Sequence, residues 1–309
     1  MDGGQSSTTA LIADETGCII GRGRGGPCNH VATAEGREKF LSAIGDCLDQ
    51  ACREARIDAA IVKFAALCFG MSGGGEDKEL YARELIRSER YKITHDAEIA
   101  LTGAIAGEPG IIMIAGTGSM AFGRNSGGKK ARAGGWGYVF GDEGGAFDLT
   151  RRALQASLRS EEGWGEETAL RRSLLEATGA TTANELLHQF YGRFDRSYIA
   201  TLANLVTQAA ESGDSVAGAI LHEAAEKLAW YATGVYKQLF ASPETVPVAY
   251  VGGVFKSERF RNEFSQCVWA AIACKTIAPQ FSPAAGALLE ALRLDGNPSP
   301  LSGLAEVPQ

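Results

Sequence analysis

The strongest constraint on the fold of this chain is a series of glycine-rich turns that follow short apolar runs, densest between residues 111 and 149. The apolar run at residues 111–115 predicts a buried strand, and a Gly-Thr-Gly-Ser turn at residues 116–119 follows it directly. Because glycine accepts positive φ and has no side chain, such a turn can bend sharply and leave its amide groups exposed. Exposed amides can hold phosphate oxygens. The stretch therefore predicts a phosphate-binding turn at the end of a strand.

Three common nucleotide motifs do not explain the glycines. Residues 116–121 spell G-x-G-x-x-A, but a dinucleotide-binding turn must open a helix, and residues 121–127 predict a returning strand and a loop. Residues 21–26 spell G-x-G-x-x-G, yet Pro27 and polar residues follow instead of a helix. Residues 123–130 lack the serine or threonine that follows the lysine of a P-loop. We therefore exclude dinucleotide-binding and P-loop sites here.

Length and charge limit the class of protein. With 309 residues, of which 45% are hydrophobic, the chain can bury a substantial core and has the length of two domains. A net charge of −7 without a block of lysine and arginine argues against a nucleic-acid partner. The start lacks a signal-peptide pattern and no apolar run is long enough to span a membrane, so we expect a cytoplasmic protein without a membrane partner.

The seven cysteines are scattered and form no C-x-x-C pair. This spacing indicates neither a disulfide framework nor a zinc or iron–sulfur site. We expect most of them to be small core residues in a reducing compartment.

The periodicity of apolar residues predicts two successive α/β halves. In the first half we expect a hairpin at 8–14 and 18–21, strands at 61–69 and 91–94, and helices at 33–57, 77–88 and 98–106. In the second half we expect two strands from residue 111, a strand at 248–251, a weak strand at 276–278, and helices at 147–158, 167–177, 183–190, 197–211, 215–240, 257–271 and 284–294. The tail from residue 295, which is rich in proline and serine, is expected to be frayed.

Five segments, in this order, resemble the N-acetylglucosamine kinases of the BadF/BadG/BcrA/BcrD ATPase group, within the actin, sugar kinase and Hsp70 superfamily. They are DGGQSST at residues 2–8, ITHDAEIALTGA around Asp96, GTGS at 116–119, GWG with GDEG at 135–144, and VGGVF at 251–255. Each glycine turn alone has low specificity. The resemblance spans nearly the whole chain, which gives the ordered set its weight.

The resemblance implies the fold. It implies two ribonuclease-H-like (actin-like ATPase) domains that close on ATP with a nucleotide and sugar cleft between them. The first domain would be residues 1–109 joined by the C-terminal helix 283–295, the second residues 110–282, and residues 296–309 a tail. It also implies a homodimer, and an apolar central strand ahead of Asp2, where this chain offers Met1.

The resemblance also implies roles for individual residues. Asp96 would be the catalytic base, which positions the attacking hydroxyl and accepts its proton; the alternative is an N-cap of the following helix. Asp2 would help to hold Mg²⁺, a cation that prefers few carboxylates together with water and phosphate oxygens. The cofactor-binding set would be Gly4, Ser6, Ser7, Gly116, Thr117, Gly118, Gly252, Gly253 and Ser257.

The implied sugar-binding set is Asn29, His30, Ser72, Gly73, Ser119, Gly135, Trp136, Gly137 and Asp142. Amide and carboxylate groups suit a ring whose hydroxyls both donate and accept, and Trp136 could give that ring an apolar wall. Packing in the core is the alternative for Trp136, as it is for most single tryptophans.

The implied activity is transfer of the γ-phosphoryl group of ATP to the 6-hydroxyl of N-acetylglucosamine or a related amino sugar, with ATP and Mg²⁺ as cofactors. An ATPase activator of 2-hydroxyacyl-CoA dehydratases has the same fold, but it needs a cysteine-held iron–sulfur site, and the glycine turns here contain no cysteine placed for one. A nucleotide-dependent sensor that binds a sugar without turnover is a further alternative, against which the presence of Asp96 argues.

Overall fold

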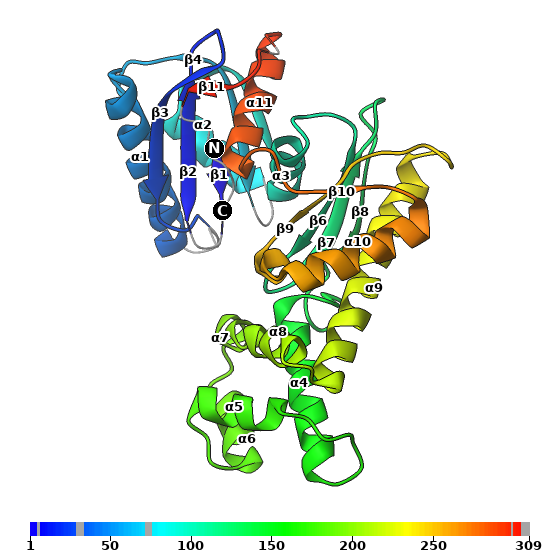
Figure 1. Ribbon diagram of the computed structural model, residues 1–309. Coiled ribbons are helices and arrows are strands. Elements are labelled where there is room, and N and C mark those ends of the chain that lie inside the picture. The colour runs from blue at the N-terminus through cyan, green and yellow to red at the C-terminus, as the bar shows by residue number, and fades with distance from the viewer. Residues whose placement is uncertain (5–6, 29–33, 72–75, 298, 304–309) are drawn as a thin grey trace. The chain divides into compact units, whose positions relative to one another are not determined.

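The computed structural model describes residues 1–4, 7–28, 34–71, 76–297 and 299–303. The chain divides into two compact units (Figure 1). Unit 1 combines Met1–Gly110 with Ala278–Gln309, and unit 2 is Ile111–Ile277. Each unit is built on one mixed sheet.

The sheet of unit 1 has the strand order β11-β3-β2-β1-β4-β5. Strand β2 pairs antiparallel with both β3 and β1, whereas β1, β4 and β5 run parallel to one another. The central strand β1 has only two residues, and a cavity of about 70 Å³ lies beside Met1 between β2 and β4. The strands are β1 (Asp2–Gly3), β2 (Thr8–Ala13), β3 (Cys18–Gly25), β4 (Phe64–Met71), β5 (Ser88–His95) and β11 (Ser302–Gly303).

Helices cover both faces of this sheet. Because alternate residues of a strand face opposite sides, β4 sends Leu67, Phe69 and Met71 into the core beneath α1, while Cys68 packs with Ile99 of α3 and with α11. The helices are α1 (Ala34–Ala55), α2 (Glu76–Leu85), α3 (Asp96–Ala104) and α11 (Pro283–Asp295).

The glycines of β3 serve packing. A Cβ at Gly23 would overlap the carbonyl oxygen of Cys47 in α1, and Gly21 and Gly25 meet the same helix one turn to either side. Glycine therefore lets α1 lie directly on β3, which explains the G-x-G-x-G pattern without a nucleotide.

The sheet of unit 2 repeats the topology of unit 1. Its order is β10-β9-β6-β7-β8, so in both units the first five strands lie in the spatial order third, second, first, fourth, fifth. The duplication is one of topology, because no matching sequence repeat accompanies it. The strands are β6 (Gly110–Ala115), β7 (Ser119–Arg124), β8 (Lys130–Gly134), β9 (Val248–Val251) and β10 (Thr276–Ile277).

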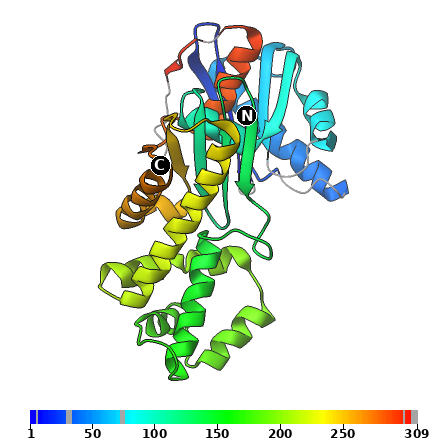
Figure 2. The same cartoon turned by 90° about the vertical axis from the view of Figure 1, so that its right-hand side faces the viewer.

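Unit 2 adds a group of helices at one end of its sheet. Helix α9 packs on β7, β8 and α10 and continues to α8 and α4 in this group, as both views show (Figure 2). The helices are α4 (Ala146–Glu161), α5 (Leu170–Thr178), α6 (Ala183–Gly192), α7 (Arg196–Thr201), α8 (Ala203–Glu211), α9 (Ser215–Leu239), the 3₁₀ turn η1 (Gly253–Lys256) and α10 (Glu258–Ile272).

Two expectations about elements are wrong. The single helix expected at 197–211 is interrupted at Leu202, where hydrogen bonds between residues three apart replace the α-helical pattern. The tail expected to fray contains β11, which pairs in parallel with Cys18 and Ile19 of β3, and Asn297 Nδ2 donates to the carbonyl of Glu15. Tertiary pairing orders this part of the tail despite its composition.

The cysteines are mostly core residues, as the sequence predicts, because five of the seven are buried. Within the described residues, none of the helices has the length and apolarity needed to cross a membrane.

A buried charge cluster joins three elements of unit 1. Lys92 Nζ of β5 lies 2.8 Å from Glu98 Oε1 of α3 and 2.6 Å from Glu290 Oε2 of α11. Thr94 donates to Glu98, and Thr102 donates to Glu290, each at 2.6 Å. Burial would lower the pKa of Lys92, but its hydrogen bonds to Glu290 and Glu98 outweigh burial and raise it. Lys92 therefore compensates two buried carboxylates.

The variant Lys92→Met should lower the free energy of unfolding by about 3 kcal/mol, because it removes the cation nearest to two buried carboxylates and leaves Glu290 with Arg293, which is 3.7 Å away. Urea unfolding followed by circular dichroism measures this. Lys63→Met is the matched control, because Lys63 pairs with Glu89 at the surface and should cost less than about 1 kcal/mol. Equal losses in the two variants would contradict the role given to the cluster.

Candidate functional site

Unit 1 places Asp2 and Asp96 at the same edge of its sheet. Asp2 in β1 lies opposite Gly70 in β4, and Gly70 lies opposite Thr94 in β5, two residues before Asp96. Because β1, β4 and β5 run parallel, their carboxyl ends meet at this edge, where ligands of such sheets bind. The register therefore brings together the residues predicted to hold Mg²⁺ and to act as base.

The pKa of the Asp2 carboxyl group is set by burial and by the charges of its neighbours. Burial, with the nearby Asp96 carboxylate, raises the pKa of Asp2 from 3.8 to about 6, although the N-terminal amine acts in the opposite direction. No described lysine or arginine forms an ion pair with Asp2. A half-buried acid near a second acid fits a divalent cation, which would neutralise the local charge. The described residues contain no group of three or more His, Cys, Asp or Glu side chains that could hold a metal ion.

Asp96 is the first residue of α3, and it is His95 that occupies the N-cap. The alternative role of Asp96 as the N-cap residue is therefore wrong, because the N-cap lies one residue earlier. Asp96 Oδ1 accepts from the amide of Ala97 at 2.8 Å, and an acid in the first turn is favoured by the helix dipole.

The predicted turn after β1 is formed where the structure describes it. The Gly4 amide donates to the Ser7 carbonyl at 3.0 Å, and Ser7 is exposed. Five further predictions lie outside the described residues: Ser6 for the cofactor, and Asn29, His30, Ser72 and Gly73 for the sugar.

In unit 2 the turn at 116–119 is joined to the start of α4. The amides of Ala146 and Phe147 donate to the carbonyls of Gly116 and Thr117 at 2.8 and 3.1 Å. These bonds use amides that the first turn of a helix leaves without a partner. The turn and the helix start therefore form one rigid element.

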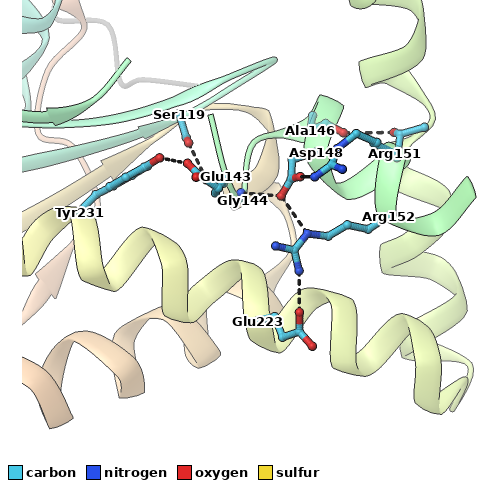
Figure 3. Close-up of polar contacts among 10 residues, drawn as sticks. Ser119, Glu143, Gly144, Ala146, Asp148, Arg151, Arg152, Glu223 and Tyr231 are labelled. Atoms are coloured by element: carbon cyan, nitrogen blue, oxygen red, sulfur yellow. Dashed lines mark hydrogen bonds and ion pairs between the residues drawn. The ribbon is translucent and has the colours of Figure 1, made fainter. Parts of the chain in front are cut away.

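The segment at 141–144 is fixed against this element by side chains (Figure 3). Ser119 Oγ donates to the Glu143 carbonyl at 2.6 Å, and the Tyr231 hydroxyl donates to the Glu143 carboxylate. Burial and the Glu143 hydrogen bond raise the pKa of Tyr231, so it remains a donor. The Gly144 amide donates to Asp148 Oδ2 at 3.0 Å, and Arg151 and Arg152 pair with the same carboxylate.

Asp142 is held at the centre of this arrangement. It is 6% exposed and has φ of 64°, which is in the left-handed region. Its Oδ1 faces the Ser119 amide at 3.4 Å, and its Oδ2 pairs with Arg196. A Cβ at Gly118 would overlap this carboxylate, so a larger residue there would displace Asp142.

Trp136 is 64% exposed, so core packing is excluded for it. Arg132 stacks on its ring at 4.6 Å from the centroid. Gly135 and Gly137, which flank Trp136, both have positive φ. The Gly135 amide donates to the Ser119 carbonyl at 3.0 Å. Four predicted sugar-binding positions, 119, 135, 136 and 142, therefore belong to one connected set of loops.

A cavity of about 600 Å³ lies within unit 2. Gly116 and Thr117 line one side, and Gly253 and Ser257 line another, although these pairs are far apart in the sequence. Gly118 instead contacts Asp142, and Gly252, with φ of 114°, packs against the Ala115 carbonyl. Ser257 also caps α10 by accepting from the Phe260 amide at 3.3 Å.

The polar residues that line one side of this cavity were not predicted from the sequence. Asn204, Thr207 and Gln208 of α8 line it, together with Lys256. The three α8 residues follow the helical spacing i, i+3, i+4, so they share one face, and Val206, Ala209 and Ala210 are buried on the other. That polar stripe is the signal that could have identified them.

The sequence pattern of the BadF/BadG/BcrA/BcrD ATPase family matches residues 1–291. This chain belongs to the BadF/BadG/BcrA/BcrD ATPase family. The predicted family is confirmed, and so is the predicted fold of two ribonuclease-H-like domains.

Named relatives of this BadF/BadG/BcrA/BcrD ATPase are sugar kinases. The N-acetylmuramic acid/N-acetylglucosamine kinase of Clostridium acetobutylicum is 35% identical over 209 residues, which are 65% of this chain and 68% of that protein. The N-acetyl-D-glucosamine kinase of Dictyostelium discoideum is 29% identical over 268 residues, 82% and 83% of the two chains. Both relatives are phosphotransferases with an alcohol acceptor, the enzyme class that the sequence predicts.

A solved structure supports the same grouping. A protein of Chromobacterium violaceum, provisionally named an N-acetylglucosamine kinase, matches this family member with a TM-score of 0.72 at 29% identity. The match covers 93% of this chain and 96% of that one.

In this family member, Asp2→Asn should raise the free energy of unfolding without metal. The folded carboxyl group titrates near pH 6 and the unfolded one near 3.8, so the buried charge destabilises the fold above pH 6 and much less near pH 4. We expect a gain of about 2–3 kcal/mol at pH 7.5 and less than about 1 kcal/mol at pH 4. Urea unfolding in EDTA tests this. Asp14→Asn should act in the opposite direction, because the Thr16 hydrogen bond lowers the pKa of Asp14.

Two neighbouring glycines of the same turn provide a further test. Gly118→Ala should destabilise by about 1–3 kcal/mol, because the new methyl group displaces the Asp142 carboxylate. Gly116→Ala should be nearly neutral, because no atom lies within 4 Å of the new methyl group. Thermal unfolding of the two variants compares them, and a larger loss at Gly116 would contradict this account of the turn.

Proposed function

We propose that this chain is an ATP-dependent kinase that transfers the γ-phosphoryl group to the 6-hydroxyl of N-acetylglucosamine or a related amino sugar. The observation that carries the proposal is the cavity of unit 2, in which the turn at 116–119 meets Gly253 and Ser257. Two segments predicted to bind the nucleotide line one cavity of a size that suits a cofactor.

In the proposed complex, unit 2 binds the nucleotide mainly through neutral groups. Glycine at 116 and 253 lets the backbone approach phosphate closely. The amides and hydroxyls of Asn204, Thr207 and Gln208 suit the hydrogen-bonding groups of a nucleoside. Among the described residues that line this cavity, Lys256 is the one cation.

The sugar would bind at the loops around Asp142. The Asp142 carboxylate accepts hydrogen bonds from hydroxyls, and the exposed face of Trp136 offers an apolar surface for the ring. The names of both curated relatives include N-acetylglucosamine, which supports an N-acetylated amino sugar as the substrate class.

Unit 1 would supply the acid–base chemistry. Asp96, fixed at the start of α3, would orient the attacking hydroxyl and accept its proton as the bond to phosphorus forms. Asp2 would hold Mg²⁺, either directly or through water. When bound, the cation neutralises charge on the phosphate oxygens.

The proposal is tested by sugar-stimulated ADP release with N-acetylglucosamine, N-acetylmuramic acid, glucosamine and N-acetylmannosamine. We expect turnover that depends on Mg²⁺, and a product whose ¹³C signal at carbon 6 shows coupling to phosphorus. Binding of ATP and sugar without turnover would favour a sensor instead. Gel filtration with light scattering tests the proposed homodimer.

The variant Asp96→Asn should reduce kcat by about 10²–10⁴-fold, because the amide cannot accept the proton. Calorimetry should show nucleotide affinity within about twofold of the parent, because the nucleotide cavity lies within unit 2. Asp49→Asn, an exposed position on α1, is the matched control and should leave kcat unchanged. A normal kcat for Asp96→Asn would remove this residue from the base role.

A further inference from the structure

Arg196 is a residue of unit 2 that the predicted site does not include, yet it contacts the centre of that site. It is the first residue of α7, and its Nη2 pairs with Asp142 Oδ2. Its Nε is buried and has no hydrogen-bond partner among the described residues. The ion pair with Asp142 is therefore the main polar contact of this guanidinium group.

Arg196 is itself held in place from two sides. Asp195 caps α7, accepting from the amides of Ser197 and Tyr198 at 2.9 and 3.0 Å, which fixes the backbone. The guanidinium lies 5.2 Å from the ring centroid of Tyr138 and 5.7 Å from that of Phe147. Arginine stacks favourably on aromatic faces at such distances.

Asp142 needs such a partner for two reasons. A buried carboxylate without a cation or several donors is strongly destabilising. In addition, its left-handed backbone conformation costs free energy and persists only where the surroundings enforce it. Apart from the Arg196 pair, the hydrogen bond that this carboxylate accepts within the described part of the chain is a long one, from the Ser119 amide at 3.4 Å.

We propose that Arg196 is a positioning residue that holds the Asp142 carboxylate ready for the sugar. This inference rests on the proposed function. Arg196 occupies Oδ2, so Oδ1, which faces Ser119, is the oxygen that accepts from a sugar hydroxyl. Arg196 acts through Asp142 and does not touch the reacting atoms.

The test is a double-mutant cycle between the two residues, read by sugar affinity. Arg196→Met should raise the Kd and KM for N-acetylglucosamine about 10-fold or more, because the carboxylate loses its orientation. The KM for ATP should stay within about twofold, and Arg196→Lys should recover part of the sugar affinity. In an Asp142→Asn background, Arg196→Met should change sugar affinity by less than about twofold.

Arg193→Met is the control, because Arg193 is exposed, lies three residues away and carries the same charge. It should match the parent in every measurement. Unchanged or tighter sugar binding by Arg196→Met, or an equal loss in the Asp142→Asn background, would overturn the proposal.

A second readout does not need the sugar. Arg196→Met should lower Tm by roughly 5 °C, and adding Asp142→Asn should restore most of that loss. If the parent neither binds nor phosphorylates any sugar, the proposed function fails, and this Tm cycle still decides whether Arg196 holds Asp142. Additive losses of Tm would overturn the positioning role independently of the activity.

Discussion

The arrangement of unit 2 depends on the hydrogen bonds between the turn at 116–119 and the start of α4. Two carbonyls of the turn accept from the amides of Ala146 and Phe147, so the turn caps the helix by its backbone alone. Residues 120–145 connect the turn to α4, so this segment must begin and end beside the turn. Its returning end, residues 141–145, consequently lies against the turn, with Asp142 beside Gly118. The close approach of backbone to backbone explains why glycine recurs on both sides.

The two units share one topology but place different chemical groups at the ends of their strands. In unit 1 the short β1 carries Asp2, and β5 leads into Asp96. In unit 2 the equivalent first strand, β6, leads into the turn at 116–119, and the fourth strand, β9, leads into Gly252 and Gly253. The same edge of the repeated sheet thus presents carboxylates in one unit and backbone amides in the other. Neither set is basic, in keeping with the acidic composition of the chain.

Local patterns made the fold predictable where packing follows periodicity. Buried apolar runs predicted β4, β6 and β9, and the Glu15-Thr16-Gly17 turn predicted the hairpin of β2 and β3. The resemblance supplied Asp2, Asp96 and Asp142, which no periodicity could have assigned. The break at Leu202 is a local change in hydrogen bonding that the apolar periodicity did not mark. The pairing of β11 depends on contacts distant in sequence, so local propensity could not reveal it. The pairing of Arg196 with Asp142 could not be predicted for the same reason, because 53 residues lie between them in the sequence.

The return of α11 to unit 1 affects the order in which the protein can fold during synthesis. Ala287 and Ala291 complete the core around Cys68 and Ile99, and Glu290 completes the charge cluster around Lys92. Until the ribosome has released residues 283–295, the part of the first sheet that packs against α11 is uncovered, and Lys92 lacks Glu290. Unit 2, which is continuous in sequence, can complete its core earlier. The first third of the chain to be made therefore completes its core last, and it is the part that carries Asp2 and Asp96.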